Sequence, residues 1–409
     1  MARQRRQGSR PVSSKSVRRV LMTADGVGGV WDYCLDLARG LARLGLRVEL
    51  AVMGELGAER RAEAESVDGL RLHHGPFKLE WMEGGIADVP ASGEWLLDLE
   101  AAVKPDLVHL NTYAHGDLPW RAPCLVVAHS CVLSWWLAVK GRMAPRHWLG
   151  YAELVKRGIM GADVVAAPTK HMLDSLRSLY GRMAPGIAIR NGCDPAVFMP
   201  GRKRPFVLGA GRIWDEAKNM AALDKAARGL AWPVRIAGEW RHPCGNSCKP
   251  ACAEYLGFLP RAALARKMAE ASIYCLPARY EPFGLSVLEA AMCGCALVLG
   301  DIGSLRELWD GAAVFVDPED HKGLRNALTL LMIRKGLRAR MAREARARAL
   351  TMTAERTALR YAAVYNLMAG DGLGLARIEC LDEPMAHAPT PSCATDEPGK
   401  SPLALAEGA

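Results

Sequence analysis

Short apolar runs alternate with amphipathic stretches along this chain, and the alternation occurs twice. Residues 17–24 and 46–53 are apolar runs that flank a helix-length stretch, which predicts two buried strands joined by a helix. Further strands are predicted at 106–110, 124–130, 163–168, 205–212, 234–240, 272–278 and 295–301. Strands that alternate with helices indicate parallel sheets covered on both faces. We therefore expect an α/β fold with two doubly wound domains that face each other across a cleft.

The strand and helix pattern begins again near residue 195, and 409 residues leave room for two cores. We expect a first domain over 16–194 and a second over 195–350. A helix over 351–369 is predicted to cross back onto the first domain. Residues 1–15 and 370–409 show little hydrophobic periodicity and are predicted to form a basic and an acidic disordered tail.

The net charge of +9 is concentrated in two places. Seven bases and no acid lie within residues 1–19, and seven bases with one acid lie within 334–348. Because the excess is not spread over the surface, we expect no nucleic-acid partner. The basic helix at 334–348 is expected to be a solvated face, and a weak peripheral membrane contact stays open as the alternative.

Twelve cysteines lie mostly in apolar segments, where a free thiol behaves as a small hydrophobe. A reduced, cytoplasmic location is the simplest expectation. No run of 18 apolar residues occurs and no apolar stretch follows the N-terminal bases, so neither a membrane span nor a signal peptide is predicted. Cys244, Cys248 and Cys252, with His242 nearby, are either a zinc site or a variable surface loop.

The strongest chemical signal is the stretch after the strand predicted at 272–278. The backbone N–H groups of Phe283, Gly284 and Leu285 are expected at a helix N-terminus, which binds phosphate through free amides and the helix dipole. Glu281 and Glu289 are too far apart in sequence to form the close carboxylate pair of a glycosidase. We expect them to contact different parts of one extended ligand.

The segment EPFGLSVLEAAMCGCALV resembles the E-x7-E signature of the retaining glycosyltransferases of family 4, which have the GT-B fold of two Rossmann-like domains. GRIWDEAKN, NGCDPAVFMP and YLGFLPRAALARKMAEA resemble further motifs of that family, and the likeness covers about residues 17–370. It implies transfer of a hexose from a nucleoside-diphosphate sugar, with UDP-glucose ahead of GDP-mannose, in polysaccharide biosynthesis or a related process. A glycan, a lipid-linked sugar and a small metabolite all remain open as acceptor. Retention of configuration and independence of metals and cofactors are implied as well.

The resemblance also implies roles for individual residues. Arg212 and Lys218 would neutralise the diphosphate, Glu281 would bind donor-sugar hydroxyls and Glu289 ribose hydroxyls. His129, after the strand at 124–130, would contact the donor sugar. The implied catalytic residues are thus Glu281, His129, Arg212 and Lys218, and the implied donor-binding residues are Gly28, Gly29, Phe283, Gly284, Leu285 and Glu289.

Three alternatives follow from the same residues. A dehydrogenase is disfavoured because Trp31 stands where a third glycine would be and the strand after it does not end on an acid. A catalytically silent nucleotide-sugar binding protein and a GT-B nucleotide-sugar epimerase remain as rivals of the transferase, although the four charged residues together favour an active enzyme. Trp135 and Trp136 either line an acceptor groove or pack in the core.

Overall fold

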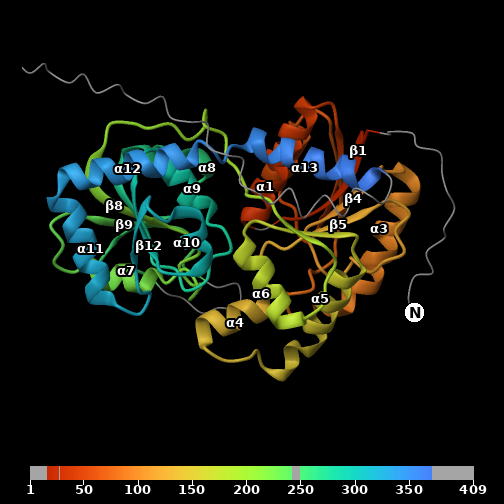
Figure 1. Ribbon diagram of the computed structural model, residues 1–409, viewed down its shortest axis with the longest axis horizontal. Helices are drawn as coiled ribbons and strands as arrows, with labels where there is room; N and C mark the ends of the chain where they lie inside the picture. The colour runs from red at the N-terminus through yellow and green to blue at the C-terminus, as the bar shows by residue number, and fades with distance from the viewer. Residues whose placement is uncertain (1–15, 27, 242–248, 371–409) are drawn as a thin grey trace, which may run out of the picture.

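The computed structural model describes residues 16–26, 28–241 and 249–370, and these form the two α/β domains predicted from the sequence (Figure 1). Each domain is built on one parallel sheet with helices on both faces. The two predicted tails lie outside the described residues, apart from Gly370. His242, Cys244 and Cys248 of the candidate zinc site also lie outside them.

The first domain has a seven-stranded sheet in the order β3-β2-β1-β4-β5-β6-β7. Its strands are β1 (Arg19–Asp25), β2 (Arg47–Met53), β3 (Leu70–Gly75), β4 (Leu107–Leu110), β5 (Cys124–Val127), β6 (Val164–Ala167) and β7 (Gly186–Ala188). The α-helices between them are α1 (Gly29–Arg43), α2 (Ala58–Glu65), α3 (Val89–Val103), α4 (Val132–Lys140), α5 (Leu149–Gly161) and α6 (Lys170–Tyr180). Two apolar clusters, one on each face of the sheet, form its core.

The second domain has a six-stranded sheet in the order β10-β9-β8-β11-β12-β13. Its strands are β8 (Arg204–Ala210), β9 (Val234–Ala237), β10 (Glu254–Gly257), β11 (Ala271–Leu276), β12 (Ala296–Gly300) and β13 (Ala313–Val316). Its helices are α7 (Met220–Ala227), α8 (Arg261–Glu270), α9 (Leu285–Met292), α10 (Gly303–Trp309), α11 (His321–Ile333) and α12 (Lys335–Ala349). Every residue of the central strand β11 is buried, as a strand covered on both faces requires.

Four strands that the hydrophobic pattern does not predict are the four edges of the two sheets. These are β3 and β7 in the first domain and β10 and β13 in the second. The exposed and half-buried positions in β3 and β10 interrupt the apolar run that marks a central strand. Edge strands have one unpaired side and tolerate polar residues, so their sequence signal is weak.

The chain returns to the first domain through α13 (Ala354–Ala369), the last helix among the described residues, which packs against α1 (Figure 1). Just before α13, Thr353 forms a bridge with Cys193, so the two segments that connect the domains run side by side. A Cβ on Gly192 would lie 2.2 Å from the backbone of Thr353, so this crossing requires glycine. The contact between α1 and α13 is equally close, because a Cβ on Gly40 would lie 2.5 Å from the Cβ of Ala358.

The basic helix α12 lies on the second domain, against α9 and β12. Three of its arginines donate to backbone carbonyls: Arg338 to Leu331, Arg346 to Met292 and Arg348 to Asp310. Part of its charge therefore satisfies carbonyls at helix and loop ends. Within the described part of the chain, no helix has the length and apolar character needed to cross a membrane.

The packing of α13 on α1 predicts the effect of Gly40→Ala. In an exposed helix this change stabilises by about 1 kcal/mol, because alanine is the better helix former. Here the added methyl meets Ala358, and we expect the free energy of unfolding to fall by about 1–3 kcal/mol, measured by urea denaturation. The added change Ala358→Gly should recover part of the loss. Gly336→Ala in α12, where a Cβ meets nothing within 4 Å, is the control and should not destabilise.

Candidate active site

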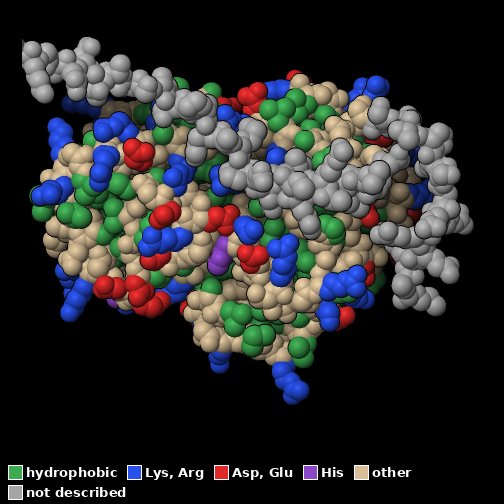
Figure 2. All heavy atoms as spheres, viewed as in Figure 1, with side chains coloured by type: hydrophobic (Ala, Val, Ile, Leu, Met, Phe, Trp, Pro, Cys, Tyr) green, Lys and Arg blue, Asp and Glu red, His purple; other side chains and the backbone are tan. Residues whose placement is uncertain are grey.

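The predicted site residues lie on loops at the carboxyl ends of strands in both sheets. Arg212 and Lys218 follow β8, Glu281 follows β11, His129 follows β5 and Gly28 follows β1. Acidic and basic side chains gather where the two domains meet on the face shown in Figure 2. A surface pocket lined by Glu100, Asp106 and Arg121, among others, lies at the opposite, amino-terminal ends of β4 and β5 and has no part in this arrangement.

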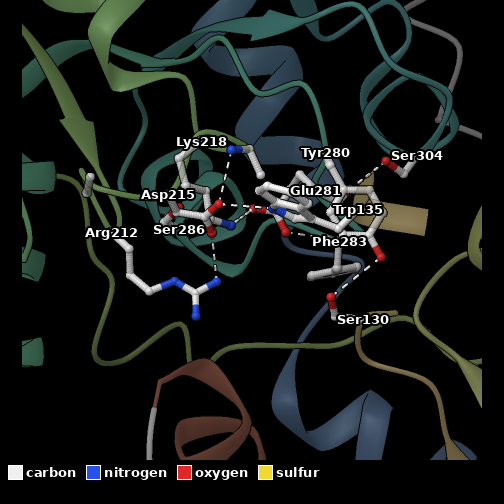
Figure 3. Close-up of polar contacts among 12 residues, drawn as sticks. Ser130, Trp135, Arg212, Asp215, Lys218, Tyr280, Glu281, Phe283, Ser286 and Ser304 are labelled. Atoms are coloured by element: carbon white, nitrogen blue, oxygen red, sulfur yellow. Dashed lines mark hydrogen bonds and ion pairs between the residues drawn. The ribbon is translucent and has the colours of Figure 1, made fainter. Parts of the chain in front are cut away.

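Lys218 and Glu281 form an ion pair beyond the carboxyl ends of β8 and β11 in the second sheet (Figure 3). The Lys218 Nζ lies 2.5 Å from Glu281 Oε2, and the side chains are only 19% and 10% exposed. The other carboxylate oxygen of Glu281 accepts a long hydrogen bond, 3.4 Å, from the backbone N–H of Phe283. Ser304 donates to the Glu281 carbonyl at 2.5 Å, which holds this loop in place. Two residues 63 apart in sequence are thus held together beside the start of α9.

The turn into α9 has the shape that the sequence predicts. Gly284 is the N-cap and has a φ of 86°, a left-handed conformation that favours glycine. A Cβ here would also come within 3.1 Å of Val287. Across the domain boundary, a Cβ on Gly29 would lie 3.5 Å from the side chain of Leu285, so the start of α1 faces the start of α9. Two helix N-termini, each with free backbone amides, therefore face the same region.

Arg212 is oriented by a buried carboxylate that the sequence motifs do not single out. Its Nη2 donates to Asp215 Oδ2 at 2.9 Å, and Asp215 is 6% exposed whereas Arg212 is 50% exposed. The other oxygen of Asp215 accepts from the Ala217 N–H at 3.0 Å and from Trp135 Nε1 at 3.2 Å. Trp135 belongs to α4 of the first domain, so this carboxylate also joins the domains (Figure 3). Trp135 therefore makes a polar domain contact, while Trp136 beside it is half-buried.

Glu289 lies in a second charged group, apart from the Lys218–Glu281 pair. Burial raises its pKa to about 8; Arg261 opposes this rise, and Asp32 and Asp36 add to it. Arg261, at the start of α8, donates two hydrogen bonds to Asp36 of α1, at 3.0 and 2.5 Å. This pairing joins the two domains next to Glu289. The two glutamates of the motif thus belong to different charged groups.

His129 lies on the first-domain side of the same region. Its Nε2 is 2.7 Å from Asn111 Oδ1, and its ring meets that of Tyr33 edge-on, with centroids 4.6 Å apart. Burial lowers its pKa to about 4, so His129 is neutral at pH 7. The following residues, Ser130 and Cys131, hydrogen-bond to the hydroxyl of Tyr280, next to Glu281. Tyr280 thereby fastens the His129 loop to the Glu281 loop.

The described residues contain no group of three or more His, Cys, Asp or Glu side chains placed to hold a metal ion. Of the cysteines in the candidate zinc loop, only Cys252 is described, and it is an exposed free thiol.

Comparisons with known proteins agree with this architecture. Residues 27–197 match the family Glycosyltransferase Family 4, and residues 202–348 match Glycosyl transferases group 1. A D-inositol 3-phosphate glycosyltransferase of Xylanimonas cellulosilytica is 28% identical over 78% of this chain and 87% of its own length. The glycogen synthase of Mycobacterium tuberculosis is 31% identical over 62% of this chain and 66% of its own length.

Solved structures with the same fold include sucrose-phosphate synthase from Thermosynechococcus elongatus and HepE from Anabaena, the latter in complex with UDP and glucose. Their TM-scores are 0.70 and 0.64, at 19% and 17% identity. The matches cover 85% and 84% of this chain and 98% of each of the other chains. The fold is thus that of the GT-B class, and the chain is a glycosyltransferase that belongs with the family 4 enzymes.

The raised pKa of Glu289 predicts how the stability of Glu289→Gln varies with pH. A carboxyl that titrates near pH 4.5 when unfolded and near 8 when folded binds more protons in the folded state. Its contribution to stability is complete below pH 4.5 and is lost as pH rises through about 8. Between pH 6 and 8, the free energy of unfolding of the variant, relative to that of the wild type, should therefore rise by about 1 kcal/mol per pH unit.

Denaturant unfolding of both proteins at several pH values measures this difference. Glu344→Gln, an exposed position on α12, is the control and should follow the wild type at every pH. A difference between Glu289→Gln and wild type that does not change with pH would show that Glu289 is ionised in the folded protein throughout this range.

Proposed function

We propose that this enzyme transfers a hexose from a nucleoside-diphosphate sugar, with UDP-glucose favoured over GDP-mannose, and that the transfer needs no metal ion. The observation that carries the proposal is the Lys218–Glu281 pair beside the N-terminus of α9. A cation, a carboxylate and the backbone amides of a helix N-terminus lie side by side here, which supports the binding of a sugar diphosphate. The GT-B relatives add support, since HepE was solved with UDP and glucose.

The departing diphosphate would be stabilised by charge that is already in place. As the bond from the sugar C1 to the phosphate oxygen breaks, the electron pair leaves with the diphosphate, and negative charge grows on its oxygens. Lys218, the half-exposed Arg212 and the amides of residues 283–285 would stabilise this charge electrostatically. Asp215 orients Arg212 while the Arg212 side chain stays half-exposed, so Arg212 can turn toward the phosphates.

The sugar and ribose would be held by the other polar groups. Donor binding would draw Lys218 toward the diphosphate and leave Glu281 to accept from hydroxyls of the hexose. Glu289, whose pKa of about 8 leaves it mainly protonated at pH 7, can both donate to and accept from ribose hydroxyls. The acceptor hydroxyl would bond to C1 on the face from which the phosphate leaves and pass its proton to a departing phosphate oxygen, which retains the configuration.

The acceptor is proposed to bind on the first domain. A glycan, a lipid-linked sugar and a small metabolite fit the described residues equally. A cytoplasmic location and a weak membrane contact through α12 remain predictions from composition.

A panel of nucleotides and sugar nucleotides tests the donor by thermal shift. We expect UDP and UDP-glucose to raise the unfolding temperature by several degrees at saturation, because a ligand that binds only the folded state stabilises it. Addition of EDTA should not remove the shift. Equal, negligible shifts for UDP and GDP compounds would contradict a donor site of this kind.

Substitution of the ion pair tests the catalytic assignment. Lys218→Ala and Glu281→Gln should each lower kcat about 100-fold or more in a transfer assay. The first removes positive charge that stabilises the departing diphosphate, and the second removes the carboxylate that orients the hexose. Lys225→Ala, an exposed lysine on nearby α7, is the matched control and should transfer at the wild-type rate. Full activity in both site variants would remove these residues from the mechanism. Turnover of the sugar nucleotide without an acceptor would instead favour an epimerase.

A further inference from the structure

A chain of hydrogen bonds runs from His129 to α13, the last helix among the described residues. His129 Nε2 lies 2.7 Å from Asn111 Oδ1, and the same oxygen lies 3.2 Å from His109 Nε2. On its other side, His109 Nδ1 lies 2.6 Å from the hydroxyl of Tyr365 in α13. Asn111, His109 and Tyr365 lie outside every motif that the sequence offers.

The surroundings of Asn111 determine which atom of its amide faces the histidines. Its Nδ2 lies 2.6 Å from the backbone carbonyl of Thr23, a group that can only accept. The NH2 group must therefore point to Thr23, and the carbonyl oxygen points to the two imidazole rings. The backbone N–H of Asn111 donates to Thr23 Oγ1 at 2.8 Å, which fixes the residue at the end of β4.

An amide oxygen cannot donate, so both histidines must donate to it. His129 and His109 therefore each carry their hydrogen on Nε2, since a neutral imidazole has only one. The bare Nδ1 of His109 accepts from Tyr365. The bare Nδ1 of His129 has no hydrogen-bond partner among the described residues, and it is not one of the buried atoms shut off from solvent.

We propose that Asn111 is a positioning residue that fixes His129 as the Nε2–H tautomer, so that Nδ1 accepts a hydrogen bond from a hydroxyl of the bound donor sugar. This inference rests on the proposed function, because it assigns a ligand to His129. Nδ1 of His129 is then the nitrogen that hydrogen-bonds to the sugar, and it acts only as an acceptor. Because burial lowers the pKa of His129 to about 4, a second proton does not cancel that acceptor at neutral pH.

Nitrogen-15 NMR of histidine-labelled protein tests the tautomer directly in the wild-type enzyme. At pH 8 we expect the His129 ring to show a protonated Nε2 and an unprotonated Nδ1, with the signal assigned by its loss in His129→Gln. The tautomer itself is read in the wild-type enzyme and needs no activity. A protonated Nδ1 on His129 would overturn the proposal.

Two variants of Asn111 then test the positioning role. Asn111→Ala removes the acceptor, so we expect the His129 signals to move toward a mixture of tautomers and kcat/KM for UDP-glucose to fall about tenfold. Asn111→Asp keeps an oxygen that accepts from Nε2–H, so it should restore the tautomer. Because its second oxygen would face the Thr23 carbonyl, which only accepts, we expect stability and activity to recover only in part. A merely structural role for Asn111 would lower stability without moving the tautomer.

The outcomes separate this inference from the proposed function. An unchanged tautomer in Asn111→Ala overturns the positioning role, whatever happens to activity. A changed tautomer with undiminished kcat/KM shows that His129 does not accept from the sugar, which also overturns the inference. Failure of the wild-type enzyme to bind or transfer any sugar nucleotide would instead refute the proposed function, while the tautomer of His129 would still be measurable.

Discussion

All strands in both sheets run parallel, so the carboxyl ends of the strands lie on one side of each sheet. The arrangement of the site residues depends on how these two sides are held facing each other. Polar contacts do this from both sides: Arg261 of the second domain pairs with Asp36, Trp135 of the first donates to Asp215, and Tyr280 receives the backbone N–H of Cys131. These contacts bring loops from distant parts of the sequence into one region.

Some of the groups that join the domains also lie beside site residues. Asp215 binds Trp135 and orients Arg212, and Arg261 binds Asp36 while its charge acts on Glu289. A ligand that drew Arg261 away from Asp36 would weaken a domain contact at the same time. Donor binding would then be coupled to the relative position of the domains through this shared side chain.

The sequence predicts the central strands well because burial on both faces leaves uninterrupted apolar runs, as in β11. It does not predict the edge strands β3 and β10, whose half-solvated residues interrupt that pattern. Glu281 and Lys218 can be found because they occur within family motifs. Asn111 lies outside those motifs, and Asp215 lies within GRIWDEAKN without a role that the motif assigns to it. Their importance comes from partners 18 and 80 residues away, His129 and Trp135, which only the fold brings close.

We propose above all that Lys218 and Glu281 separate when the donor binds, so that Lys218 contacts the diphosphate and Glu281 contacts the hexose. Calorimetric titration of UDP and of UDP-glucose into Lys218→Ala and Glu281→Gln tests it most directly. We expect Lys218→Ala to weaken both ligands alike, by about tenfold or more, and Glu281→Gln to weaken UDP-glucose while UDP binds as well as before or better. Equal weakening of UDP and UDP-glucose by Glu281→Gln would contradict the account.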